Sequence, residues 1–148
     1  MTSLTWPVRA ALGFVAAVIA TLTFHQAMWA VLHAAGLMPP APFPMNPTAP
    51  WGVPKMLSLC FWGGLYGAVF GVVMPRLTAP LWLCGLTLGI IAALVGMLVV
   101  LPLKGMPVGY GFAWRPWVVS LLINGFWGIG VGVIAPLLMR GAARPALR

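Results

Sequence analysis

Four long apolar runs divide the chain. They cover about residues 8–35, 53–74, 81–101 and 117–139. Each run has roughly 20 residues or more, and at 1.5 Å per residue such a helix crosses about 30 Å of hydrocarbon. Prolines lie near the ends of the runs, as is typical of helix boundaries. The pattern predicts an all-α integral membrane four-helix bundle, with residues 1–148 forming a single transmembrane domain.

The composition agrees with a membrane protein and excludes several kinds of enzyme. Of the residues, 62% are hydrophobic and 5% are charged, whereas globular proteins have about 45–50% and 25%. The chain contains no Asp or Glu, so it cannot use paired carboxylates for acid–base catalysis or hold Mg²⁺ or Ca²⁺ with carboxylates. We therefore expect no enzymatic activity, no cofactor and no metal site.

The basic residues are scattered singly near the ends of the apolar runs. They are Arg9, Lys55, Arg76, Lys104, Arg115, Arg140, Arg144 and Arg148. Because they form no stripe with interleaved aromatic residues, we expect no nucleic-acid binding. Five of them lie on the side of the termini and three on the other, so the positive-inside rule predicts that both termini are cytoplasmic. We expect anionic lipid at Arg140, Arg144 and Arg148.

The first apolar run and the two cysteines have ordinary explanations. The run is too long for the apolar part of a signal peptide, so we expect that it is retained as a membrane span. Cys60 and Cys84 are isolated within apolar runs and form no Cys-x-x-Cys motif. We therefore expect inert thiols.

The connection between the first two runs is rich in proline. Residues 38–54 read MPPAPFPMNPTAPWGVP. Such a segment is stiff and has few N–H donors, so we expect that it cannot join a sheet. Two interpretations remain open: a rigid cap over the outer end of the bundle, or a strip on which a partner docks.

A short motif occurs twice, in the second and the fourth run. Residues 61–67 and 126–132 both read Phe-Trp-Gly, followed by three residues and a further glycine. A repeat that contains an even number of spans keeps its direction in the membrane. The motif therefore favours two helical hairpins related by a parallel repeat.

Glycines in these two runs recur at every fourth position and so lie along one helix face. They are Gly63, Gly67 and Gly71 in the second run and Gly128 and Gly132 in the fourth. Small residues at this spacing allow two helix backbones to approach closely. We expect packing within the chain, with a seam between copies of the chain as the alternative.

Polar residues gather toward the end of the bundle that the proline-rich segment covers. The candidate cluster consists of His25, Ser58, Ser120 and Asn124, with Lys55 and Arg115 just above it at the outer surface. Gln26 and His33 lie on the same part of the first run. Three interpretations remain open: hydrogen bonds between helices, a site for a ligand or permeating solute, and a metal or haem site.

The two histidines do not suit a shared metal. His25 and His33 are eight residues apart, about 12 Å along a helix. His25 with Met28 could form half of a Cu(I) site, although no His-Met repeat supports it. A Ser–His nucleophile is not expected, because the chain offers no nucleophile elbow and no carboxylate to orient the histidine.

Several short segments carry a resemblance to a known group of proteins. They are residues 24–26 (FHQ), 32–37 (LHAAGL), 52–54 (GVP) with Ser58, 61–64 (FWGG), 102–105 (PLKG) and 124–128 (NGFWG). Together they resemble a family of small, uncharacterised four-span inner-membrane proteins of Proteobacteria. The resemblance implies a bacterial inner membrane and brings no assigned activity.

Two functions fit these patterns. The first is a structural or accessory membrane protein that acts through helix–helix contacts, with a homo-oligomer or another membrane protein as its partner. The alternative is a small transporter or channel for a neutral or anionic solute. A water-filled cavity that reaches past Asn124 would favour transport, whereas a dry interior packed with glycine would favour the accessory role.

Overall fold

The computed structural model describes residues 4–143, which form four helical spans of membrane length. The spans are Trp6–Ala34, Lys55–Arg76, Leu81–Leu103 and Trp114–Ala142. All four are long and apolar enough to cross a bilayer, and this confirms the predicted all-α membrane bundle. The fourth helix starts three residues before the apolar run, at Trp114, because Pro116 is tolerated in the first turn of a helix.

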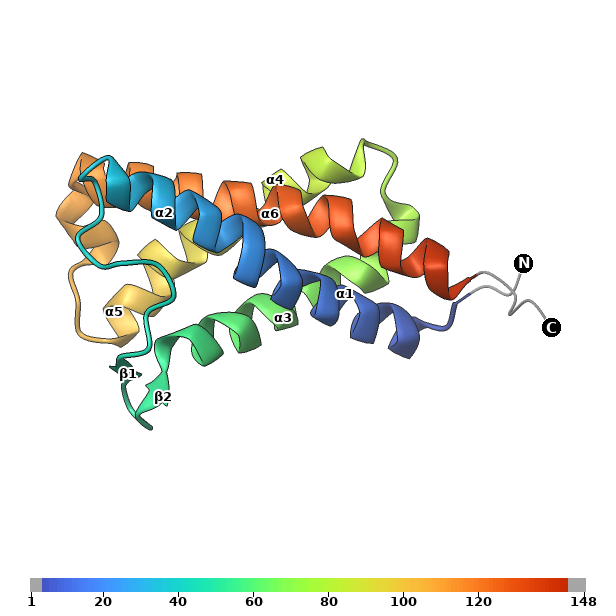
Figure 1. Ribbon diagram of the computed structural model, residues 1–148, viewed down its shortest axis with the longest axis horizontal. Helices are drawn as coiled ribbons and strands as arrows, with labels where there is room; N and C mark the ends of the chain where they lie inside the picture. The colour runs from blue at the N-terminus through green and yellow to red at the C-terminus, as the bar shows by residue number, and fades with distance from the viewer. Residues whose placement is uncertain (1–3, 144–148) are drawn as a thin grey trace.

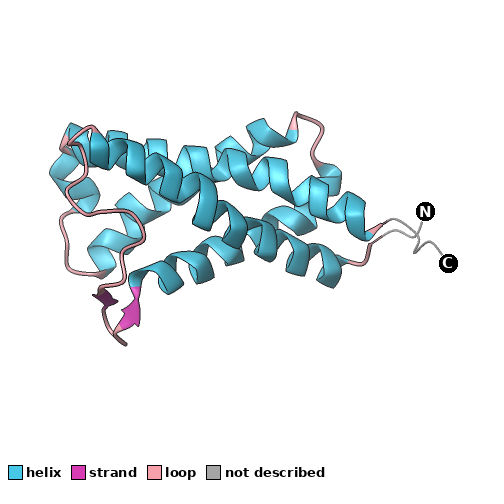
Figure 2. Ribbon diagram, viewed as in Figure 1, coloured by secondary structure: helices cyan, strands magenta, loops and turns pink. Residues whose placement is uncertain are grey.

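The spans are helical, as Figure 2 shows, and two of them contain a π-helical turn. The first is α1 (Trp6–Ala20), a π-helical turn (Thr21–His25) and α2 (Gln26–Ala34). The third is α4 (Leu81–Val95), a π-helical turn (Gly96–Val100) and α5 (Leu101–Leu103). The second is α3 (Lys55–Val73) with a 3-10 turn (Met74–Arg76), and the fourth is α6 (Trp114–Ala142), preceded by a 3-10 segment (Val108–Phe112).

The four spans form two helical hairpins. The most extensive contacts join α4 to α6 and α1 to α3, and the hairpins meet mainly through α1 and α6. Contacts between α3 and α4 are few. The start of α1 and the end of α6 lie at the same end of the bundle (Figure 1). The hairpins are therefore joined firmly along one side and loosely along the other.

Glycines lie at the crossing within each hairpin. A Cβ atom added to Gly13 of α1 would collide with the carbonyl of Gly67 of α3. In the second hairpin, a Cβ atom on Gly85 of α4 would collide with the carbonyl of Gly128 of α6 and approach Gly132. Each crossing thus places one glycine against a Gly-x-x-x-Gly pair of the other helix, which leaves no room for a side chain.

The five glycines singled out in the sequence face other helices of the same chain. Gly67 and Gly71 meet α1, whereas Gly128 and Gly132 meet α4. Gly63 lies beside the hydroxyl of Thr21 and the ring of Trp127. The helices of this chain therefore already occupy the glycine grooves.

The packing does not follow the register of the sequence repeat. The repeated motif aligns Gly63 with Gly128, whereas the helix crossings make Gly67 the counterpart of Gly128, one turn further along. The two tryptophans of the motif also differ, because Trp62 is 58% exposed and Trp127 is 3% exposed. The structure contains the two predicted hairpins. That they arose by duplication of one hairpin stays a prediction.

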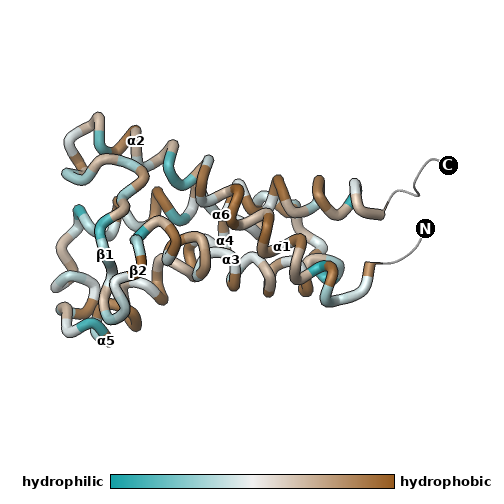
Figure 3. The backbone as a smooth tube through the Cα atoms, turned by 60° about the horizontal axis from the view of Figure 1, so that its bottom comes forward, coloured by the Kyte–Doolittle hydropathy of each residue, from teal (hydrophilic) through white to brown (hydrophobic). Residues whose placement is uncertain are grey.

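The core lies where the two hairpins meet and is built largely from small residues. Its fully buried members include Ala16, Ala17 and Ala20 of α1 and Val131 and Ala135 of α6. Figure 3 shows hydrophobic residues along the middle of the bundle and most hydrophilic ones toward the end that carries the two short strands. The bundle is therefore apolar in its centre and polar mainly at one end.

The prediction that the proline-rich segment cannot join a sheet is wrong. Strands β1 (Pro47–Thr48) and β2 (Val53–Pro54) pair antiparallel, with Thr48 opposite Val53 and Pro47 opposite Pro54. Lys55 donates its N–H to the carbonyl of Asn46, 3.0 Å away. Since hydrogen-bonded pairs alternate in an antiparallel ladder, the prolines occupy the pair that needs no N–H donor.

Candidate functional site

The polar end of the first span is shaped by its π-helical turn. Such a turn brings successive side chains closer in angle around the helix axis, and π turns often occur at functional sites. Here the neighbours His25 and Gln26 are both buried, together with Thr21 one turn earlier and Trp29 one turn later. One helix therefore presents four side chains with polar atoms to the inside of the bundle.

Three side chains of the first span hold the proline-rich segment in place. Gln26 accepts a hydrogen bond from the N–H of Phe43 at 2.6 Å, and Trp29 donates its indole N–H to the carbonyl of Pro40 at 2.9 Å. His33 donates from Nδ1 to the carbonyl of Met38 at 2.8 Å. These three hydrogen bonds hold segment 38–54 in place as a cap. In two of them a backbone carbonyl of the segment is the acceptor, since its prolines have no N–H to donate.

Gln26 is the residue that connects the cap to the buried histidine. Its Nε2 donates to Nδ1 of His25 at 3.1 Å, while its Oε1 accepts from the cap. Because an amide nitrogen donates only, Nδ1 of His25 acts as the acceptor here. The sequence shows Gln26 as a polar residue, but its adjacency to His25 was the only signal of this role.

Lys55 joins this group through an aromatic ring. Its Nζ lies 5.2 Å from the centroid of the Trp29 ring, and the His25 ring lies 5.8 Å from that of Trp29. A cation at this distance is attracted to the face of the indole. His25, Gln26, Trp29 and Lys55 therefore form one connected group under the cap, which we call the cap cluster.

The remaining predicted site residues lie outside the cap cluster. Asn124 donates from its side chain to the carbonyl of Ser120 in its own helix, at 2.9 Å. Arg115 is exposed beside the ring of Trp114, and Ser58 is half-buried. Within residues 4–143 no hydrogen bond joins Ser58, Ser120 or Asn124 to His25. The structure thus brings His25 and Lys55 into one group, and among the described residues Ser58, Ser120, Asn124 and Arg115 contribute no hydrogen bond to it.

Among the described residues, the structure brings no metal-binding set together. Across residues 4–143, no group of three His or Cys side chains is close enough to hold an ion. His25 uses Nδ1 with Gln26 and His33 uses Nδ1 with the cap. Met28 packs against the buried Trp29, Leu32 and Ile123.

Below the cap cluster, a hydrogen bond between the two hairpins closes the interior. The indole N–H of Trp127 donates to the carbonyl of Ala17 at 3.2 Å, and the hydroxyl of Thr21 donates to the same carbonyl at 2.8 Å. Within the described part of the chain, every buried side-chain nitrogen and oxygen has a hydrogen-bond partner. In this part of the chain, no buried side-chain nitrogen or oxygen is left unpaired for a solute to bind.

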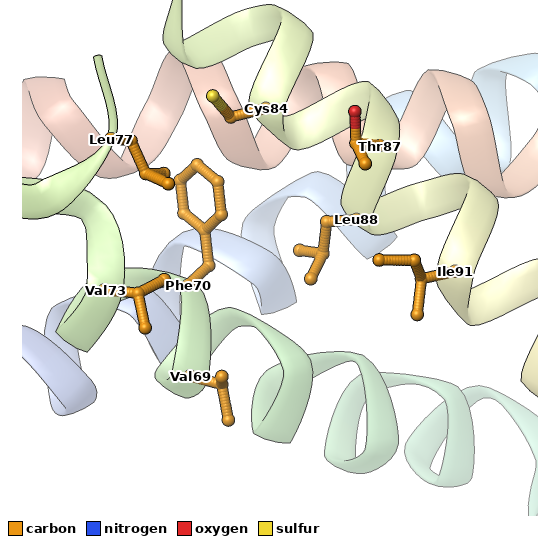
Figure 4. Close-up of a pocket in the computed structure, with 8 residues that line it drawn as sticks. All are labelled: Val69, Phe70, Val73, Leu77, Cys84, Thr87, Leu88 and Ile91. Atoms are coloured by element: carbon orange, nitrogen blue, oxygen red, sulfur yellow. The ribbon is translucent and has the colours of Figure 1, made fainter. Parts of the chain in front are cut away.

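A cavity lies on the loosely joined side, between α3 and α4 (Figure 4). It has a volume of about 230 Å³ and is open toward the surroundings. Its lining is apolar apart from Thr87, whose hydroxyl is bonded to the carbonyl of Leu83 in its own helix. We call it the α3–α4 groove; its residues are Val69, Phe70, Val73, Leu77, Cys84, Thr87, Leu88 and Ile91.

No family model, curated protein or solved structure matches this chain. Its function is therefore inferred from three features of its own: the capped polar end, the closed interior and the open apolar groove. The first two bear on what can pass through the bundle. The third bears on what lies beside it.

Proposed function

We propose that this protein is a structural or accessory protein of the bacterial inner membrane that acts through contacts between its helices and those of a partner. The observation that carries the proposal is the closed interior. A carrier or channel needs polar groups that exchange their partners for a solute or for water. Here every buried side-chain nitrogen and oxygen atom of residues 4–143 is paired within the chain.

The outer half of α3 supplies a face for such a partner. Leu57, Phe61 and Trp62 are each more than half exposed, and the rings of Phe61 and Trp62 pack edge to face at 5.4 Å. Aromatic side chains are enriched at the centres of protein interfaces. We call these three residues the α3 face.

Trp62 lies at an unusual depth for an exposed tryptophan. It is seven residues from Lys55, about 10 Å along the helix, and so lies below the interface where tryptophan is usually enriched. In the described part of the chain its indole N–H has no hydrogen-bond acceptor, unlike those of Trp29, Trp117 and Trp127. An unpaired donor is costly in hydrocarbon, and a partner helix that offers an acceptor would remove this cost.

The orientation belongs to the same proposal. Arg9, Arg76 and Arg140 stand at the end of the bundle that carries the start of α1 and the end of α6, whereas Arg144 and Arg148 lie outside the described residues. The positive-inside rule supports a cytoplasmic location for this end. Anionic lipid at Arg140, Arg144 and Arg148 and the inner membrane as the location complete the proposal, in keeping with the resemblance of the sequence to inner-membrane proteins.

Photo-crosslinking in intact membranes tests the accessory role. A photoreactive phenylalanine analogue would replace Trp62, and as a matched control it would replace Val133, an exposed residue of α6. We expect a discrete protein adduct from position 62 and only lipid adducts from position 133. The adduct mass tells a second copy of this chain from a different partner. Lipid adducts alone at position 62 would contradict the proposal.

A transporter or channel for a neutral or anionic solute is the second candidate, because the outer end is positive. Lys55, Lys104 and Arg115 stand there, and the sequence holds no acidic residue to balance them. Such a potential attracts anions. This candidate requires a water-filled path beneath the cap, which the paired interior does not favour.

A further inference from the structure

The α3–α4 groove is an apolar cavity that lies between two helices of the chain and is open toward the surroundings. Figure 4 shows the ring of Phe70 between Leu77 and Leu88, with Cys84 on the opposite helix. The few contacts between α3 and α4 explain why the groove stays open. In a bilayer, hydrocarbon has to fill a groove that opens sideways, since an empty cavity forfeits the dispersion contacts of its lining.

The length of the groove indicates what kind of molecule can fill it. Cys84 and Ile91 mark its extent on α4, and seven residues span about 10 Å along the helix. One leaflet contributes about half of the ~30 Å hydrocarbon core. The groove therefore matches part of one acyl chain within a single leaflet, the leaflet on the side of the termini.

The positive charge at the mouth of the groove favours an anionic lipid head group. Arg76 is exposed and directly precedes Leu77, which lines the groove. The sequence has no Asp or Glu, so no acidic side chain of this chain can neutralise that guanidinium. A phosphate accepts paired hydrogen bonds from a guanidinium, and the net charge of +8 further favours an anionic lipid over a zwitterionic one.

We propose that the α3–α4 groove is a binding site for one anionic phospholipid, with an acyl chain along Phe70 and Leu88 and the phosphate at Arg76. The lipid completes the side on which the hairpins barely touch. It therefore acts as a packing element between them. This site is separate from the α3 face and does not depend on the accessory role.

Lipid retention and thiol protection test this site together. The Cys60→Ala protein, in which Cys84 is the remaining thiol, is purified in detergent and mixed with phosphatidylglycerol or with phosphatidylcholine of the same acyl chains. Native mass spectrometry counts the bound lipids, and alkylation by N-ethylmaleimide measures the access to Cys84. We expect phosphatidylglycerol to be retained at least fivefold more than phosphatidylcholine and to slow the alkylation of Cys84 several-fold.

Paired variants separate the head group from the chain. Arg76→Gln is expected to lower phosphatidylglycerol retention at least fivefold, whereas Arg9→Gln, at the same end but outside the lining of the groove, leaves it unchanged. Val73→Trp fills the groove and is expected to abolish the slowing of Cys84 alkylation by lipid, whereas Val133→Trp on α6 does not.

Two outcomes would overturn the proposal. One is equal loss of lipid in Arg76→Gln and Arg9→Gln, which would mean that the charges attract lipid without a site. The other is slowing of Cys84 alkylation by lipid that survives Val73→Trp, which would place the lipid elsewhere. Should Val73→Trp fail to fold, the comparison of the two arginine variants decides alone.

Discussion

The two ends of the bundle are held together in different ways. At the capped end, side chains of the first span bind the backbone of the proline-rich segment, as Gln26 does with Phe43 and Trp29 does with Pro40. Toward the other end, helix backbones touch each other directly at Gly71 and Gly132, with no side chain between them. Hydrogen bonds thus fix the position of the cap, whereas close approach of small residues fixes the helices.

This difference indicates where the molecule tolerates amino-acid substitutions. A backbone crossing admits no added atom, because the neighbouring carbonyl cannot move without its helix. A side-chain network loses one hydrogen bond at a time and keeps the rest. We therefore expect single substitutions to cost most at the crossings, less in the cap cluster, and least at its exposed edge.

The largest effect is expected from a single methyl group at a crossing. Gly85→Ala places a Cβ on the carbonyl of Gly128, so α4 and α6 must move apart. Overpacking typically costs 1–3 kcal/mol, and we expect about 3 kcal/mol here because the obstacle is backbone. The measurement is the free energy of unfolding in mixed micelles.

Gly96→Ala is the matched control, because it makes the same change in the same span. A Cβ at Gly96 meets no atom within 4 Å. Alanine is favoured over glycine in a helix by about 0.5–1 kcal/mol, so the stability should stay the same or rise slightly. Equal destabilisation by the two substitutions would contradict the packing described for Gly85.

A smaller effect is expected from Gln26→Leu. The change leaves the N–H of Phe43 and Nδ1 of His25 without their partner, and a buried unpaired group costs about 1–3 kcal/mol. We expect a loss of about 2 kcal/mol and faster proteolysis within residues 38–54. Thr23→Val is the control, since the Thr23 hydroxyl bonds only to Ile19 of its own helix on an exposed surface. A cap as resistant to protease as in the unchanged protein would show that Gln26 does not hold it.

The two tryptophans of the repeated motif provide the next comparison. Trp127→Phe removes the hydrogen bond to Ala17 but leaves that carbonyl paired with Thr21. The expected cost in unfolding free energy is therefore near 1 kcal/mol. Trp62→Phe, at an exposed ring, should leave the stability of the isolated protein unchanged. A larger loss for Trp62→Phe than for Trp127→Phe would reverse the assignment of buried and exposed copies.

The smallest effect is expected at the edge of the cap cluster. Lys55→Gln removes the cation from the ring of Trp29, which is worth about 0.5–1 kcal/mol. Lys104→Gln removes an equal charge at the same end of the bundle and serves as the control. Unfolding in micelles should show a loss for Lys55→Gln that exceeds that for Lys104→Gln. Matching losses would mean that only the overall charge matters.

The sequence could predict the spans and the role of the glycines because both depend on local properties. A run of some 20 apolar residues has to be a helix in a bilayer, and glycines four residues apart have to share a face. The helix that each groove meets was beyond prediction. Trp62 and Trp127 stand in identical motifs, yet only contacts between the hairpins decide which one is buried.

The candidate site was predicted in part for the same reason. His25 and Lys55 were placed correctly at the capped end, but Gln26 was not singled out, because its role depends on where Phe43 lies. Asn124 turns to its own helix instead of the cluster, since an asparagine can satisfy itself on the carbonyl four residues earlier. The β1–β2 pair was missed because the prolines fall at the positions that need no donor.

The closed interior beneath the cap is tested most directly by water access at Thr21. In a Cys60→Ala, Cys84→Ala background, Thr21→Cys and Met45→Cys are each treated with a membrane-impermeant thiol reagent from the capped side. Met45 is 61% exposed on the cap, whereas Thr21 is 2% exposed beneath the cap cluster. We predict rapid labelling of Met45→Cys and none of Thr21→Cys. Labelling of both at similar rates would reveal a water path into the bundle and would replace the accessory role with transport.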